Sequence, residues 1–102
     1  MRIIITTCPK NKSEKLRENI LEEKLAGCIL NVKMEKSKFL WKGKINSEKE
    51  SILLFKTRYD LVDKLFKRIK ELHPYEVPFI ALIDVEKVNG EYEKWLNEAT
   101  GD

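Results

Sequence analysis

The chain has 102 residues, enough for one domain with a modest hydrophobic core. Hydrophobic residues make up 42% of it, which excludes a disordered chain, and no apolar run approaches the ~18 residues of a membrane-spanning helix. Charged residues make up 36%, yet 20 Lys and Arg against 17 Asp and Glu leave a net charge of only +3, with both signs mixed along the chain. A nucleic-acid surface needs clustered basic charge, so this pattern argues against one.

The two cysteines, Cys8 and Cys28, come without a secretory signal. Residues 1–7 are too short for such a signal and are rich in β-branched side chains, as a strand would be. Free thiols are therefore expected in a reducing compartment, and we predict a cytoplasmic location.

The chain opens with a strand and a helix. Residues 3–7 form a continuous β-branched run, which is typical of a strand buried on both faces. A helix capped by Asn11 or Ser13 is expected to run to about Ala26, with Gly27 as its stop.

A long hairpin arm is expected in the middle of the chain. It follows a second strand, which covers residues 28–32. Residues 37–41 are extended, residues 42–44 supply the turn, and the return leg runs through residues 45–50. Another apolar strand follows at residues 51–57.

The clearest predicted helix covers residues 59–72, because its apolar side chains recur at helical spacing. Pro74 is expected to end it near Leu72, since proline lacks a backbone N–H and restricts the residue before it. Residues 79–85 predict the last long strand, and a turn is expected at Asn89 and Gly90. One face of a short terminal helix is then formed by Tyr92, Trp95, Leu96 and Ala99.

This order of elements predicts an α+β fold, a ferredoxin-like split β-α-β sandwich with a hairpin arm and a short terminal helix, formed by residues 1–102 as one domain. Right-handed crossovers make the strands at 3–7 and 28–32 parallel, with the strand at 51–57 antiparallel between them. The strand at 79–85 then pairs on the free side of the first strand.

Two long helices cover only one face of such a sheet, although its central strands are apolar on both faces. An exposed apolar patch of that size usually marks an interface. We therefore predict a homo-oligomer in which sheets pack face to face and the arm extends onto a neighbour.

The predicted topology brings Cys8, His73, Tyr75, Glu76 and the arm with Trp41 to one end of the molecule. Cys28 begins its strand at the opposite end, ~15–20 Å away at ~3.3 Å per residue, so no disulfide with Cys8 is expected.

Cys8 and His73, together with Glu76, are candidate ligands for copper or zinc. Their spacing matches no metal motif, and a plainer interpretation stays open. It takes Cys8 as a small loop thiol and His73 as a cap on the C-terminus of a helix.

Two other groups of side chains are candidates for a binding cleft between subunits. Lys44, Lys56 and Arg58 are candidates for holding a small anion, although a solvated rim is the plainer interpretation, and Tyr75 is placed in the neighbourhood of Lys56 and Arg58. Trp41 and Tyr75 are interpreted as interface anchors, because no basic stripe accompanies them as nucleic-acid stacking would need. No nucleophile lies beside an activating base, so an enzyme is not predicted.

These motifs, taken together, resemble the CutA family of divalent-cation tolerance proteins along nearly the whole chain. The similarity is carried by Thr6-Thr7-Cys8-Pro9, Leu25-Ala26-Gly27-Cys28 with Asn31, the arm from Ser37 to Ile45, Glu50, Lys56-Thr57, His73-Pro74-Tyr75-Glu76-Val77-Pro78, and Tyr92 with Trp95-Leu96.

The resemblance implies a ferredoxin-like homotrimer built like the PII signalling proteins, in the cytoplasm, with a role in tolerance of divalent metals and copper above all. It implies no catalytic activity. Three functions remain open: a metal-binding or metal-response trimer, a PII-like sensor that binds a small anion or a protein in its cleft, and a structural scaffold.

Overall fold

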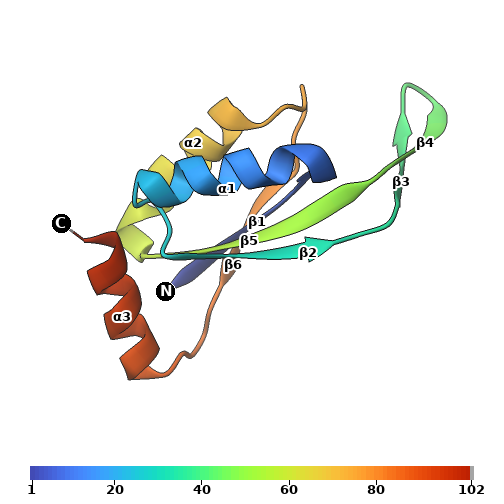
Figure 1. The fold of residues 1–102 in the computed structure, drawn as a ribbon. Helices are drawn as coiled ribbons and strands as arrows, with labels where there is room; N and C mark the ends of the chain where they lie inside the picture. The colour runs from blue at the N-terminus through green and yellow to red at the C-terminus, as the bar shows by residue number, and fades with distance from the viewer. Residues whose placement is uncertain (102) are drawn as a thin grey trace.

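The computed structural model describes residues 1–101, which form a four-stranded sheet, a separate two-stranded hairpin and three α-helices (Figure 1). The strands of the main sheet are β1 (Arg2–Pro9), β2 (Cys28–Lys33), β5 (Glu50–Thr57) and β6 (Ile80–Asp84). The hairpin consists of β3 (Ser37–Trp41) and β4 (Lys44–Glu48). The helices are α1 (Ser13–Glu22), α2 (Val62–Leu72) and α3 (Gly90–Thr100), with short 3-10 turns at Lys10–Lys12 and Tyr59–Leu61.

The strand order of the main sheet is β2-β5-β1-β6, and every neighbouring pair is antiparallel. Strands β1 and β2 are therefore parallel to each other with β5 between them, and β6 pairs with the other edge of β1. In register, Ile4 lies between Phe55 on β5 and Leu82 on β6. This arrangement confirms the predicted fold and places the two most apolar strands at the centre.

Helices α1 and α2 pack side by side on one face of the sheet, as Figure 1 shows. The core lies between these two layers and contains Ile4, Leu53 and Phe55 from the sheet, Leu16 and Ile20 from α1, and Leu65 and Ile69 from α2. Each fully buried aliphatic or aromatic side chain contributes ~1.5–3 kcal/mol, so this layer supplies most of the stability of the single chain.

Helix α1 ends at Glu22, four residues earlier than the predicted end at Ala26, so that prediction was wrong. Lys24 takes the left-handed conformation at a φ of 56°, and two backbone bonds close the end: Lys24 N–H donates to Leu21 and Leu25 N–H donates to Ile20. This is a Schellman motif with lysine where glycine is usual.

Replacing Lys24 by glycine should therefore raise the free energy of unfolding by ~0.5–1 kcal/mol, because glycine takes the left-handed conformation without steric cost. Urea denaturation of both proteins measures the difference. A destabilised glycine variant would contradict the assignment of strain to this position.

Helix α3 does not pack beside α1 and α2. It lies on the opposite side of the sheet, at the end away from the β3–β4 hairpin (Figure 1). Asn89 occupies the N-cap position without a side-chain capping hydrogen bond, and Gly90 is the first residue of the helix, so the pair predicted to form a turn starts the helix instead. Lys56 from β5 donates to the Tyr92 hydroxyl at 3.1 Å, and Tyr92 stacks on Trp95 with the ring centroids 5.4 Å apart.

Close packing of α3 depends on the missing side chain at Gly27. A Cβ atom at this position would lie 2.6 Å from Leu96 Cδ1, and Leu96 is fully buried. Gly27→Ala should cost ~1–3 kcal/mol of stability through overpacking. Leu96→Ala should be less harmful in the Gly27→Ala background than in wild type. A double-mutant cycle by chemical denaturation measures this coupling, and strictly additive effects would contradict it.

The other face of the sheet carries apolar side chains in continuous rows across the strands. One row contains Leu30, Leu54, Ile5 and Ala81, and the next contains Val32, Ile52 and Thr7. None of these side chains is fully buried, because α3 covers only one end of this face, whereas Ile4, Leu53 and Phe55 under the helices are fully buried. We call this surface the open face.

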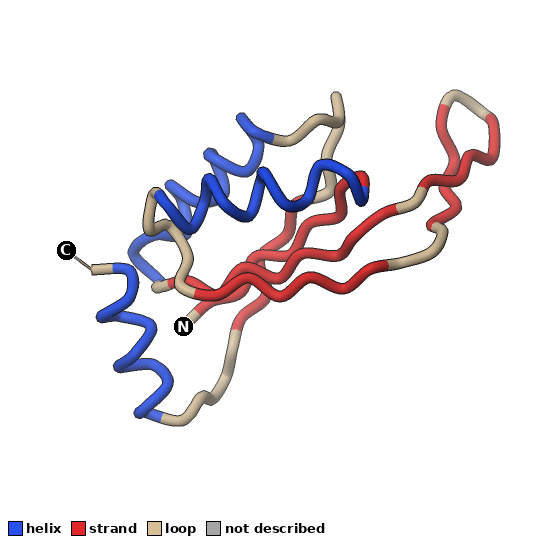
Figure 2. The backbone as a smooth tube through the Cα atoms, viewed as in Figure 1, coloured by secondary structure: helices blue, strands red, loops and turns tan. Residues whose placement is uncertain are grey.

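The hairpin β3–β4 projects beyond the main sheet and lengthens the molecule to 46 Å, against 25 and 21 Å in the other directions (Figure 2). Its turn consists of Lys42 and Gly43, both with positive φ, as tight two-residue hairpin turns require. Leu40 and Ile45 lie opposite each other near the tip, and each is 75% exposed. The predicted arm is thus confirmed, with an apolar pair facing solvent.

Candidate functional site

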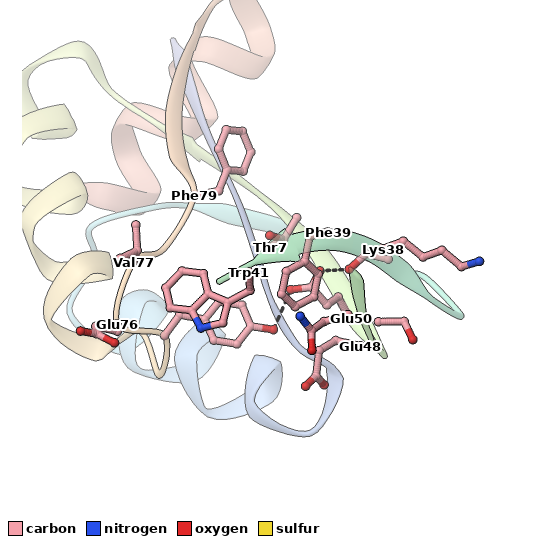
Figure 3. Close-up of a pocket in the computed structure, with 13 residues that line it drawn as sticks. Thr7, Lys38, Phe39, Trp41, Glu48, Glu50, Glu76, Val77 and Phe79 are labelled. Atoms are coloured by element: carbon pink, nitrogen blue, oxygen red, sulfur yellow. Dashed lines mark hydrogen bonds between the residues drawn. The ribbon is translucent and has the colours of Figure 1, made fainter. Parts of the chain in front are cut away.

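A cleft of about 570 Å³ lies where the base of the arm meets β1 and the loop after α2 (Figure 3). Pro74 and Pro78 keep that loop out of helical structure, so the chain runs from the end of α2 to the start of β6 along the arm. The cleft is lined by Thr7, Ser37, Lys38, Phe39, Trp41, Asn46, Ser47, Glu48, Glu50, Tyr75, Glu76, Val77 and Phe79.

His73 stands directly after α2 and fixes the start of this loop. Its Nε2 lies 2.8 Å from the carbonyl oxygen of Thr7, and its Nδ1 accepts the backbone N–H of Tyr75 at 3.1 Å. A carbonyl can only accept and an amide N–H can only donate, so both partners require the neutral ring with its proton on Nε2. Burial lowers the pKa of His73, although the bond to Thr7 and the charge of Glu50 oppose this.

Glu50 joins the arm to the loop. This carboxylate is only 6% exposed and accepts one hydrogen bond from the Ser37 hydroxyl and one from the Tyr75 hydroxyl, the latter at 2.7 Å. Burial and the bond to Glu50 raise the pKa of Tyr75 above its usual range, so the phenol keeps the proton that it donates. We call these three residues, Ser37, Glu50 and Tyr75, the arm clasp.

Cys8 is fully buried on the helix side of β1. Burial raises the pKa of its thiol to about 11, with a further contribution from the charge of Glu50 that Arg17 partly offsets. The thiol is therefore protonated at neutral pH, whereas metal binding and nucleophilic attack both need the thiolate. Cys8 and Cys28 are both free, in agreement with the predicted separation.

As a donor set for copper or zinc, His73, Cys8 and Glu76 do not fit in this conformation. Both ring nitrogens of His73 are engaged, the Cys8 thiol is buried, and Glu76 is exposed and points outward from the cleft (Figure 3). Within residues 1–101, no group of three His, Cys, Asp or Glu side chains is arranged to hold a metal ion.

The predicted cleft residues fall into two places. Trp41 and Tyr75 line the cleft, as expected. Lys56 and Arg58 lie at the far end of β5, since Glu50 begins that strand and Lys56 pairs with Cys28. Six residues of extended chain, ~20 Å, separate Lys56 from Glu50, so within one chain these cations do not share a neighbourhood with Tyr75.

Sequence reasoning did not single out the arm clasp. The sequence predicts Glu50 at the end of the arm and Ser37 at its start, and marks neither as a site residue. One signal was present: a glutamate directly before a long apolar strand is a charge that folding would bury. Its two partners are 13 and 25 residues away, and no local pattern identifies such partners.

The fold and the cleft define a class of protein: a split β-α-β sandwich of the PII-like kind, with one face of its sheet open and a projecting arm. Within this class the chain belongs to the CutA1 divalent ion tolerance protein family, whose model matches residues 2–99. This confirms the resemblance seen in the sequence.

Relatives and solved structures agree with that assignment. The divalent-cation tolerance protein CutA of Pyrococcus horikoshii is 46% identical over 101 residues, covering 98% of both chains, and that of Thermus thermophilus is 35% identical over 97% of this chain and 96% of its own. The crystal structure of CutA1 from Pyrococcus horikoshii has a TM-score of 0.93 at 43% identity with both chains fully covered. The PII-like protein CutA from Nostoc sp. PCC 7120 has a TM-score of 0.92 at 31% identity, covering 99% of this chain and 98% of its own.

The relatives are named as tolerance proteins rather than as enzymes. No helix within residues 1–101 is long and apolar enough to cross a membrane.

Proposed function

We propose that this chain acts in the tolerance of divalent metal ions, copper above all, as a cytoplasmic homotrimer that binds the metal. Support for the metal comes from the relatives, which carry the name divalent-cation tolerance protein and match along nearly the whole chain. Support for assembly comes from the open face. Its rows of Leu, Ile and Val side chains are too extensive for an isolated domain, and a sheet face of this kind is normally covered.

The open face is the observation that carries the assembly part of this proposal. Light scattering coupled to size exclusion should report a particle of three chains at micromolar concentration. A folded single chain under those conditions would contradict the assembly and every proposal that depends on a second copy.

Metal binding needs a separate test, because the predicted ligands do not come together within one chain. Titration of Cu(II) and Cu(I) against a competing chelator should show saturable binding that is weakened in Glu76→Gln, since Glu76 is the accessible member of the predicted set. Glu86→Gln removes an exposed carboxylate elsewhere and serves as the control. His73→Gln should bind like wild type. Loss of copper binding in that variant would show that His73 is a ligand after all. If wild type shows no saturable binding, the proposal that this chain binds copper is wrong.

A second function, PII-like sensing of a small ligand or a protein partner, is favoured by the preformed cleft at the base of the arm. The charge of that cleft disfavours the small anion expected from the sequence, because three glutamates and one lysine line it. A thermal-shift screen of metabolites and nucleotides tests this function. A shift produced by anions alone would overturn the charge argument.

A further inference from the structure

The carboxylate of Glu50 is buried without a cation. It is 6% exposed, its two hydrogen-bond donors are the neutral hydroxyls of Ser37 and Tyr75, and no lysine, arginine or histidine within residues 1–101 forms an ion pair with it. A buried carboxylate is costly unless a positive charge balances it. The chain therefore presents an uncompensated negative charge at the cleft wall.

Aromatic rings line the same cleft as this carboxylate. Tyr75 donates to it, and Trp41, Phe39 and Phe79 line the same cleft while remaining well exposed to solvent. Figure 3 shows Trp41, Phe39 and Phe79 in the same cleft as Glu50. The faces of aromatic rings attract cations, most strongly where the cation is desolvated.

The charge of the lining disfavours anions in this cleft. Lys38 is its one basic side chain, and its ammonium group points away from the rings (Figure 3), while Glu48 and Glu76 add negative charge. Anions are disfavoured by this balance. Inorganic divalent ions need several oxygen, nitrogen or sulfur ligands held close together, and within residues 1–101 no three His, Cys, Asp or Glu side chains are grouped to hold one.

We propose that the cleft binds a small organic cation with an alkylammonium or guanidinium head group, placed against Glu50 and between the rings of Trp41 and Tyr75. A volume of about 570 Å³ is within the range of small-molecule sites. All of the lining residues belong to one chain and the site needs no bound metal, so its test can fail while the proposed function stands.

Choline and methylguanidinium are suitable probes, with 3,3-dimethylbutanol as the uncharged counterpart of choline. The two tryptophans give two indole N–H signals in a ¹H–¹⁵N spectrum, Trp41 in the cleft and Trp95 on α3. In metal-free buffer, at least one cation should shift the Trp41 signal saturably and leave that of Trp95 unchanged. The uncharged alcohol should bind about tenfold or more weakly, because it lacks the charge that Glu50 and the rings attract.

Glu50→Gln keeps the shape of the side chain and should weaken cation binding about tenfold, whereas Glu91→Gln on the exposed surface of α3 should not. Trp41→Leu tests the same site without touching the buried clasp. Its control is Trp95→Leu, because the two tryptophans are similarly exposed, at 42% and 46%.

Three results would overturn the proposal. The first is no saturable shift of Trp41 by any cation, or equal binding of the alcohol. The second is Glu50-dependent binding of Zn²⁺ or Cu²⁺ in place of the organic cations. The third is a fall in particle size on adding cation, which would assign the cleft to a lysine or arginine of a second copy.

Discussion

Leu30→Lys should break the assembly into single chains. Leu30 lies on the open face, in the row that continues through Leu54 and Ile5, and it is 42% exposed in the single chain. An ammonium group placed there must be desolvated against apolar rows when sheets pack together, at a cost of several kcal/mol per copy. The single chain keeps its fold, because the new side chain points into solvent.

Leu21→Lys is the matched control, because Leu21 is 43% exposed but lies on α1, in the layer on the other side of the sheet. It should leave the particle size unchanged. Light scattering at the same micromolar concentration compares the three proteins, and circular dichroism verifies that each is folded. Equal masses for the two lysine variants would show that the open face is not the interface.

The stability of the protein should fall as the pH drops below 6.5, because of His73. The pKa of His73 in the folded protein lies below its ordinary value of 6.5, since burial disfavours the charged ring. The neutral ring therefore stabilises the fold fully above pH 6.5, and this contribution is lost as the pH falls through the lowered pKa. The slope can reach ~1.4 kcal/mol per pH unit between those two values.

His73 is the only histidine, so a slope between pH 5.5 and 7.5 can be assigned to it. Denaturant unfolding across that range should show the slope in wild type and not in His73→Gln. His73→Ala should lose ~2–4 kcal/mol at pH 7.5, because the carbonyl of Thr7 and the N–H of Tyr75 lose their partners. An identical slope in wild type and His73→Gln would contradict the neutral, hydrogen-bonded ring.

His73 also shows how far sequence reasoning reached. The stop at Leu72 followed from Pro74, because proline acts on its immediate neighbours, and the structure confirms it. The environment of the ring could not be predicted from the local sequence, because its Nε2 bonds to the carbonyl of Thr7, 66 residues earlier in the chain. A histidine after a helix is compatible with a ligand or with a structural bridge, and only the tertiary contact separates the two.

The prediction of where α1 ends was wrong for a different reason. Leu25 and Ala26 favour a helix, and the stop was expected at Gly27, yet the chain turns at Lys24, which takes a strained left-handed conformation. Gly27 is needed for close approach of Leu96 from α3, not for a helix cap. Tertiary packing thus determined the role of a residue that local propensity had assigned to a turn.

The sequence by itself determined the order of elements, the two central strands, the projecting arm and the excess of apolar surface, because each depends on side-chain periodicity or on turn chemistry within a few residues. Only the tertiary structure decided that Glu50 joins Ser37 and Tyr75, that the nitrogens of His73 are both engaged, and that Lys56 lies far from the cleft. These are contacts between residues distant in the chain. They depend on how the strands pair and on how the arm packs against the loop after α2.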